Sequence, residues 1–136
     1  MGMDFMSRTK RKLPKPEQCT QMALIEWFRI QYPFYYDIPI KITNESEAMH
    51  GYAHEMGLNP GASDLFFPIP KGIYCGLFLE IKKDGFTFSS STKAHIARQL
   101  SFLNKMRIMG YWAEMGVGID QCIEIVKHYM LIKDVV

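Results

Sequence analysis

The chain contains 136 residues, of which 48% have hydrophobic side chains and 22% are charged. This length fits one compact domain with its own core, and this hydrophobic share excludes a chain that is disordered throughout. No stretch approaches the roughly 20 consecutive apolar residues of a membrane span, and the N-terminus lacks the apolar core of a signal peptide. We therefore expect a non-secreted, cytoplasmic protein without a membrane partner.

The net charge of +2 is the sum of segments with opposite charge. Residues 1–16 carry +4, residues 17–81 carry −5, residues 82–107 carry +5, and the remainder carries −2. Basic segments beside an acidic one indicate an anionic partner near a carboxylate-rich site, whereas a solvated charged surface is the commoner meaning of any single segment.

The three cysteines, Cys19, Cys75 and Cys122, lie far apart and form no Cys-x-x-Cys pair. Their odd number and their spacing argue against a disulfide framework and against a structural zinc site. Because each has apolar neighbours in the sequence, we predict buried, reduced thiols.

The beginning of the chain predicts an arm followed by a helix. Residues 1–15 are basic and show no periodicity, which predicts a flexible arm before a single domain over residues 16–136. Apolar residues then recur at helical spacing, and Pro16 suits a first helical position, so we predict a helix over residues 17–31.

The middle of the chain predicts strands. Alternating isoleucines indicate a short strand over residues 38–42, in which Pro39 marks an edge or an end. The polar residues 45–56 predict a surface helix. Two apolar runs, residues 64–69 and 73–81, are separated by prolines and a glycine and predict a hairpin that enters a buried sheet.

The last third predicts helix, strand and helix. Residues 89–92 offer several N-caps for a helix that ends at Met109, and residues 111–115 and 119–131 predict a strand and a final helix. The long helix carries an apolar stripe formed by Ile96, Leu100, Leu103 and Met106. This element order predicts an α/β fold, a mixed sheet with helices on both faces.

Two acids and an amine gather at one end of the predicted hairpin. Asp64 opens its first strand, and Glu80 and Lys82 close its second, so antiparallel pairing brings them together. Because strand side chains alternate, Glu80 and Lys82 also point to the same face. Taken alone, Glu-x-Lys is more often a surface ion pair, and Asp64 is then a turn residue.

Two carboxylates at close range repel each other, and a divalent cation between them removes that cost. Carboxylate oxygens suit Mg²⁺ or Mn²⁺. The nearby Lys82 amine is placed to orient a water or to stabilise negative charge, which suits phosphodiester hydrolysis.

These residues and their surroundings resemble one family. The segments are Gly61-Ala-Ser-Asp-Leu65, Tyr74-Cys-Gly-Leu-Phe-Leu-Glu-Ile-Lys82, and Gln99 followed by Gly110-Tyr111. Together with residues 17–27 and 38–44 they resemble the VRR-NUC (virus-type replication-repair nuclease) domain, and stand-alone phage and bacterial members are the most similar in pattern. The resemblance covers roughly residues 16–130 and implies the restriction-endonuclease-like core of the PD-(D/E)xK superfamily.

The resemblance implies a role for each matching residue. Asp64, Glu80 and the backbone carbonyl of Ile81 are expected to hold Mg²⁺ or Mn²⁺, and Lys82 is expected to be the catalytic lysine. Glu17 resembles the acid of the first helix that completes or supports the metal site.

Further positions complete the expected site. Gln99 resembles the helix glutamine packed beside the catalytic lysine, and Ser63 stands where the superfamily has proline. Asn44 resembles a substrate contact. Phosphate contacts are expected from the basic residues Lys83, Lys93, Arg98, Lys105 and Arg107.

Other residues have plainer interpretations. His95 lies one turn before Gln99, so it either faces the same cleft or lies on the helix surface. His50 and His54 lack the glutamate of a zinc-protease helix and are better explained as surface or phosphate-contacting residues. Phe86 and Phe88 form either a β-tongue near the substrate or part of the core, and we predict the core.

The resemblance implies a metal-dependent endonuclease in a bacterium or a phage-infected cell. Small stand-alone members act as homodimers on branched DNA such as Holliday junctions, as in DNA repair, and a twofold dimer suits a twofold junction. One alternative is a nuclease of the same fold that acts on flap, nicked or linear DNA. The other is a DNA-binding or assembly protein without catalysis, against which the intact Asp64, Glu80 and Lys82 argue.

Overall fold

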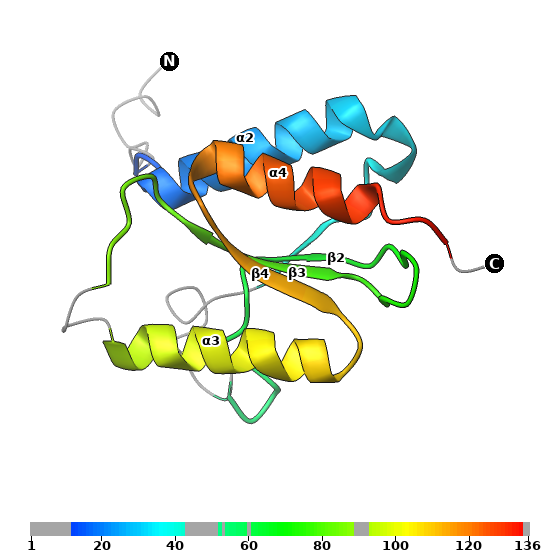
Figure 1. The fold of residues 1–136 in the computed structure, drawn as a ribbon. Helices are drawn as coiled ribbons and strands as arrows, with labels where there is room; N and C mark the ends of the chain where they lie inside the picture. The colour runs from blue at the N-terminus through cyan, green and yellow to red at the C-terminus, as the bar shows by residue number, and fades with distance from the viewer. Residues whose placement is uncertain (1–11, 43–51, 53, 60, 89–92, 135–136) are drawn as a thin grey trace, which may run out of the picture.

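The computed structural model describes residues 12–42, 52, 54–59, 61–88 and 93–134. A four-stranded sheet contains, in spatial order, β1 (Ile40–Lys41), β2 (Leu65–Phe67), β3 (Leu77–Lys82) and β4 (Trp112–Val117). The helices are α2 (Pro16–Gln31), the short 3₁₀ helix η1 (Pro33–Tyr35), α3 (Lys93–Ile108) and α4 (Gly118–Met130). The predicted α/β class, a mixed sheet flanked by helices, is confirmed (Figure 1).

The strands pair as the hairpin interpretation requires. β2 and β3 are antiparallel, with Leu65 opposite Leu79 and Phe67 opposite Leu77. β1 adds antiparallel to β2, and β4 is parallel to β3, with α3 as the connection between the two parallel strands. β1 is a short edge strand, because Pro39 has no N–H to extend the ladder.

The helices cover both faces of the sheet. Figure 1 shows α2 and α4 side by side over one face and α3 alone over the other. Leu77, Leu79 and Ile81 pack into the core beneath α2 and α4, whereas Phe78 packs with Leu103 of α3. Side chains alternate along a strand, so Glu80 and Lys82 share the α3 face with Phe78.

The ends of the helices follow local sequence signals. The predicted helix over residues 17–31 is confirmed, and the Gln18 side chain accepts a hydrogen bond from the Lys15 backbone N–H at 2.8 Å. α3 ends in a Schellman turn, in which Tyr111 N–H donates to the Met106 carbonyl and Gly110 adopts a positive φ of 97°.

The apolar stripe of α3 differs from the prediction by one position. Leu100 is 45% exposed, and Gln99 is buried between Ile96 and Leu103. Spacings of three and of four residues both keep a side chain on one helix face, so the sequence period alone does not choose between residues 99 and 100. The sheet beneath α3 carries Glu80 and Lys82, and a polar amide suits them better than leucine.

Three further predictions about exposure are wrong. Cys19 and Cys75 are exposed, and only Cys122 is buried. Phe88 is 63% exposed and packs edge-on against Phe86 instead of entering the core. Each lies in a loop or on the outward face of a helix, where apolar neighbours in sequence do not become neighbours in the core.

Several predictions fall outside the described residues. These are residues 1–11 of the arm predicted over 1–15, most of the surface helix over 45–56, and the caps at 89–92. Tyr52 and residues 54–57 form turns, in which Met56 N–H donates to the Tyr52 carbonyl at 2.9 Å. Within the part of the chain that is described, no helix is long and apolar enough to cross a membrane.

One buried hydrogen bond ties α4 to the loop after β2. The hydroxyl of Tyr129, which is fully buried, donates to the backbone carbonyl of Ile69. Tyr129→Phe leaves that carbonyl without its donor, so we expect the free energy of unfolding to fall by about 1–3 kcal/mol. Urea titration measures this change, and Tyr52→Phe, at a position 77% exposed, is the matched control. Equal stability of the two variants would contradict the assignment.

Candidate active site

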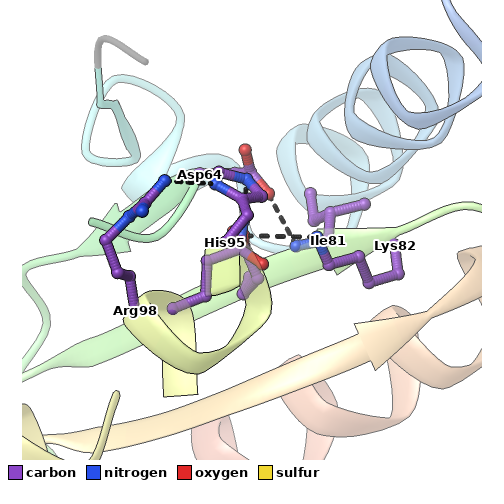
Figure 2. A network of polar contacts seen from close by, with 7 residues as sticks. Asp64, Ile81, Lys82, His95 and Arg98 are labelled. Carbon is purple, nitrogen blue, oxygen red and sulfur yellow. Dashed lines mark hydrogen bonds and ion pairs between the residues drawn. The ribbon is translucent and has the colours of Figure 1, made fainter. Parts of the chain in front are cut away.

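Asp64 and Glu80 meet at one end of the β2–β3 hairpin. The register that places Leu65 opposite Leu79 brings the residue before β2 to the end of β3. The Asp64 carboxylate Oδ2 accepts a hydrogen bond from the Ile81 backbone N–H at 2.7 Å. This bond fixes one carboxylate oxygen at the strand that carries Glu80 and Lys82 (Figure 2).

Glu80 is a buried acid with an unsatisfied oxygen. Its side chain is 2% exposed, and Oε2 has no hydrogen-bond partner. The pKa of the Glu80 carboxyl is raised to about 10, mainly by burial and then by a hydrogen bond with the Asp64 carboxyl and the negative charge of Asp64. Lys82 acts in the opposite direction, and Glu17 adds a smaller upward contribution. The uncompensated carboxyls therefore favour a proton or a cation between them.

Lys82 is held on the same face. Its amine Nζ lies 3.7 Å from Glu80 Oε1, and the side chain is buried. The Phe86 ring lies beneath the amine, with its centroid 5.2 Å from Nζ. An ammonium over an aromatic face is stabilised by the ring quadrupole, so Phe86 supports the amine instead of joining the core as predicted.

The first turns of α3 contribute polar side chains to the site. Gln99 is buried, and its Nε2 lies 3.1 Å from Nε2 of His95. The other ring nitrogen, Nδ1, lies 3.4 Å from the Arg98 guanidinium Nη2. Figure 2 shows His95 and Arg98 on α3 beside Asp64 and the end of β3. Of the two interpretations of His95, the structure therefore supports the one that faces the site.

The loop before Asp64 packs directly against α3. A Cβ at Gly61 would lie 2.7 Å from the Arg98 backbone oxygen, so only glycine permits this approach. Ser63 is buried, and its hydroxyl has no partner. Sequence reasoning missed the contribution of Gly61, because a glycine that packs on a helix backbone has the same sequence signal as one in a turn.

The oxygen donors of this site fit a divalent cation. Asp64 and Glu80 provide the hard carboxylate oxygens that Mg²⁺ and Mn²⁺ prefer, and Glu80 Oε2 is buried and unpartnered. Among the described residues, no group of three or more His, Cys, Asp or Glu lies close enough to hold a metal. Glu17 is exposed in the first turn of α2.

The predicted phosphate contacts lie in different parts of the fold. Lys83 follows Lys82 directly, and Lys93 and Arg98 belong to the turns of α3 that carry His95 and Gln99. All three are exposed, as is Lys105, which lies about 9 Å further along the helix axis than Gln99 at 1.5 Å per residue.

The remaining basic and polar candidates are less informative. Arg107 Nε donates to the Ala113 backbone carbonyl at 2.9 Å, which ties α3 to β4 and explains this arginine structurally. His54 is exposed in a turn. Asn44 and His50 lie outside the described residues, so their predicted contacts stay predictions.

Comparisons with known proteins give a match in structure. No family profile and no curated protein matches this chain. A solved structure described as a VRR_NUC domain protein superimposes with a TM-score of 0.71 over 90% of this chain and 94% of its own, at 25% sequence identity. This match in structure supports the resemblance to the VRR-NUC family that the sequence indicates.

Proposed function

We propose that this nuclease is a divalent-metal-dependent endodeoxyribonuclease whose active site comprises Asp64, Glu80 and Lys82. One observation carries the proposal: two carboxyls and an amine are held together at the end of β3, and one buried carboxyl oxygen has no partner. Such an arrangement is costly for folding alone. It is compensated when a cation and an anionic substrate bind.

Asp64, Glu80 and the Ile81 carbonyl would hold Mg²⁺ or Mn²⁺, with Glu17 adding negative charge nearby. When bound, the cation would polarise a phosphoryl oxygen and lower the pKa of water. Asp64 Oδ2 accepts the hydrogen bond from the Ile81 N–H, so the cation would bind this carboxylate through its other oxygen.

Lys82 would act on the phosphate. Its amine is confined by Glu80 and by the Phe86 ring, so little reorganisation is needed when negative charge develops on the phosphate. In the proposed reaction, the Lys82 ammonium stabilises that charge and orients the attacking water. Gln99, buried on the facing helix, completes the polar wall.

We propose branched DNA, including Holliday junctions, as the substrate, cut by a homodimer. Two sites related by a twofold axis suit the symmetry of a four-way junction. Exposed basic residues around the carboxylates, among them Lys83 and Lys93, provide phosphate contacts without base readout. Selectivity for DNA shape then depends on the spacing of the two sites.

Incubation with labelled four-way junction, flap, nicked, single-stranded and plain duplex DNA tests the proposal. We expect internal cuts in the junction with Mg²⁺ or Mn²⁺ and none with EDTA. The Asp64→Asn chain, purified in parallel, controls for contaminating nuclease.

The other outcomes separate the alternatives. Cleavage of flap or linear DNA alone would keep the nuclease and remove the junction as substrate. Binding to all five DNAs without cleavage would favour a DNA-binding role. Sedimentation at assay concentration that gives only monomer would remove the homodimer.

A further inference from the structure

His95 lies between two groups that can only donate hydrogen bonds. Its Nε2 faces the Gln99 amide nitrogen at 3.1 Å, and its Nδ1 faces the Arg98 guanidinium at 3.4 Å. A neutral imidazole has one donor and one acceptor nitrogen, and a protonated ring has two donors. Neither form satisfies both contacts as they stand.

Gln99 has the complementary problem. Its amide oxygen Oε1 is buried and has no hydrogen-bond partner. The oxygen and the nitrogen of a side-chain amide have nearly the same shape, so they are assigned from the contacts that they make. Rotating the amide by half a turn places the oxygen opposite His95 and moves the N–H₂ group to the buried position that the oxygen held.

Arg98 determines which ring nitrogen carries the hydrogen. A guanidinium is always charged and has no acceptor, so the ring nitrogen that faces it has to accept. Nδ1 is therefore unprotonated, and the hydrogen of the neutral ring lies on Nε2. That N–H then donates to Gln99 Oε1, and both contacts are satisfied.

We propose that His95 is a positioning residue that makes Gln99 present its amide N–H₂ group, not its carbonyl, to the active site. The role of that N–H₂ group in catalysis rests on the proposed function. Two other buried oxygens without a partner, on Glu80 and on Ser63, belong to the same site. An N–H donor there suits an anionic oxygen of a carboxylate or of a DNA phosphate, whereas a carbonyl oxygen would repel it.

The tautomer of His95 can be measured without any nuclease assay. Long-range ¹H–¹⁵N correlation spectra of the metal-free chain, recorded where the rings are neutral, identify which nitrogen of each of the four histidines carries the hydrogen. His95→Gln assigns the His95 signals by their loss. We expect the Nε2–H form. The Nδ1–H form would overturn the proposal, whatever the chain does to DNA.

Two substitutions test the effect on catalysis. His95→Gln places an amide nitrogen near the position of Nε2 and can still donate to Gln99, whereas His95→Asn is too short. We expect His95→Gln to retain kcat within about threefold and His95→Asn to lose about 10- to 100-fold, a range typical of residues that orient an active-site group. Thermal melts of both chains verify folding.

Each result has a defined meaning. Equal activity of the two variants, whether both are high or both are low, would remove the positioning role. If His95→Asn fails to fold, the tautomer measurement decides alone. If the wild-type chain cleaves none of the five DNAs, the proposed function fails, and the orientation of Gln99 is still determined by the spectrum.

Discussion

Replacing Asp64 by asparagine is expected to lower single-turnover DNA cleavage by about 1,000-fold and to abolish Mn²⁺ binding. Asparagine retains an oxygen that can accept the Ile81 N–H bond, so the hairpin should stay folded. What it removes is the charge that, with Glu80, would neutralise a cation. The loss of one fixed electrostatic contribution at a reacting phosphate corresponds to factors of about 100 to 1,000, and the loss of the cation adds to it.

Two control variants make this result specific. Lys82→Met removes the amine and no carboxylate, so it should lose cleavage and retain Mn²⁺ binding, measured by electron paramagnetic resonance. Glu124→Gln alters an acid on α4 that is 64% exposed and pairs with Lys127, so both properties should stay unchanged. Wild-type cleavage by Asp64→Asn in the presence of metal would contradict the assignment of the site.

The core of the fold could be predicted from the sequence because several patterns indicate the same elements. β3 is buried at all six positions, and an almost continuous apolar run is what a strand covered on both faces requires. Asp64 and Glu80 are brought together by antiparallel pairing, which depends on strand order and not on exact lengths. This explains why the meeting of these carboxyls could be predicted although both strands are shorter than expected.

The details around the site could not be predicted, because they depend on the neighbouring layer. Whether α3 buries residue 99 or residue 100 is decided by the polar groups on the sheet below, and the helical period permits both. The contact of Gly61 with the Arg98 carbonyl joins segments 37 positions apart. The assignment of a hydrogen to one nitrogen of His95 requires the positions of Arg98 and Gln99, which no spacing provides.

At pH values below the raised pKa of Glu80, the affinity for metal is expected to rise about tenfold for each unit by which the pH increases. Burial and Asp64 raise that pKa to about 10, so the metal-free chain carries a proton at Glu80 near neutral pH. A carboxyl must lose its proton to become a ligand, so each cation that binds releases about one proton. Between about pH 6 and about pH 8, the apparent affinity for Mn²⁺ should therefore increase about 100-fold.

Calorimetric titration of Mn²⁺ in buffers with different heats of ionisation measures the released protons directly. A value near one per ion is expected, and Glu80→Gln should abolish both the release and the binding. The pH dependence of metal affinity distinguishes this case from one in which Lys82 keeps the Glu80 carboxyl ionised. In that second case the pKa of Glu80 would be lowered, and the affinity for metal would not change over this pH range. Constant affinity without proton release would mean that the Lys82 amine, 3.7 Å away, outweighs burial and Asp64 in setting the charge of Glu80.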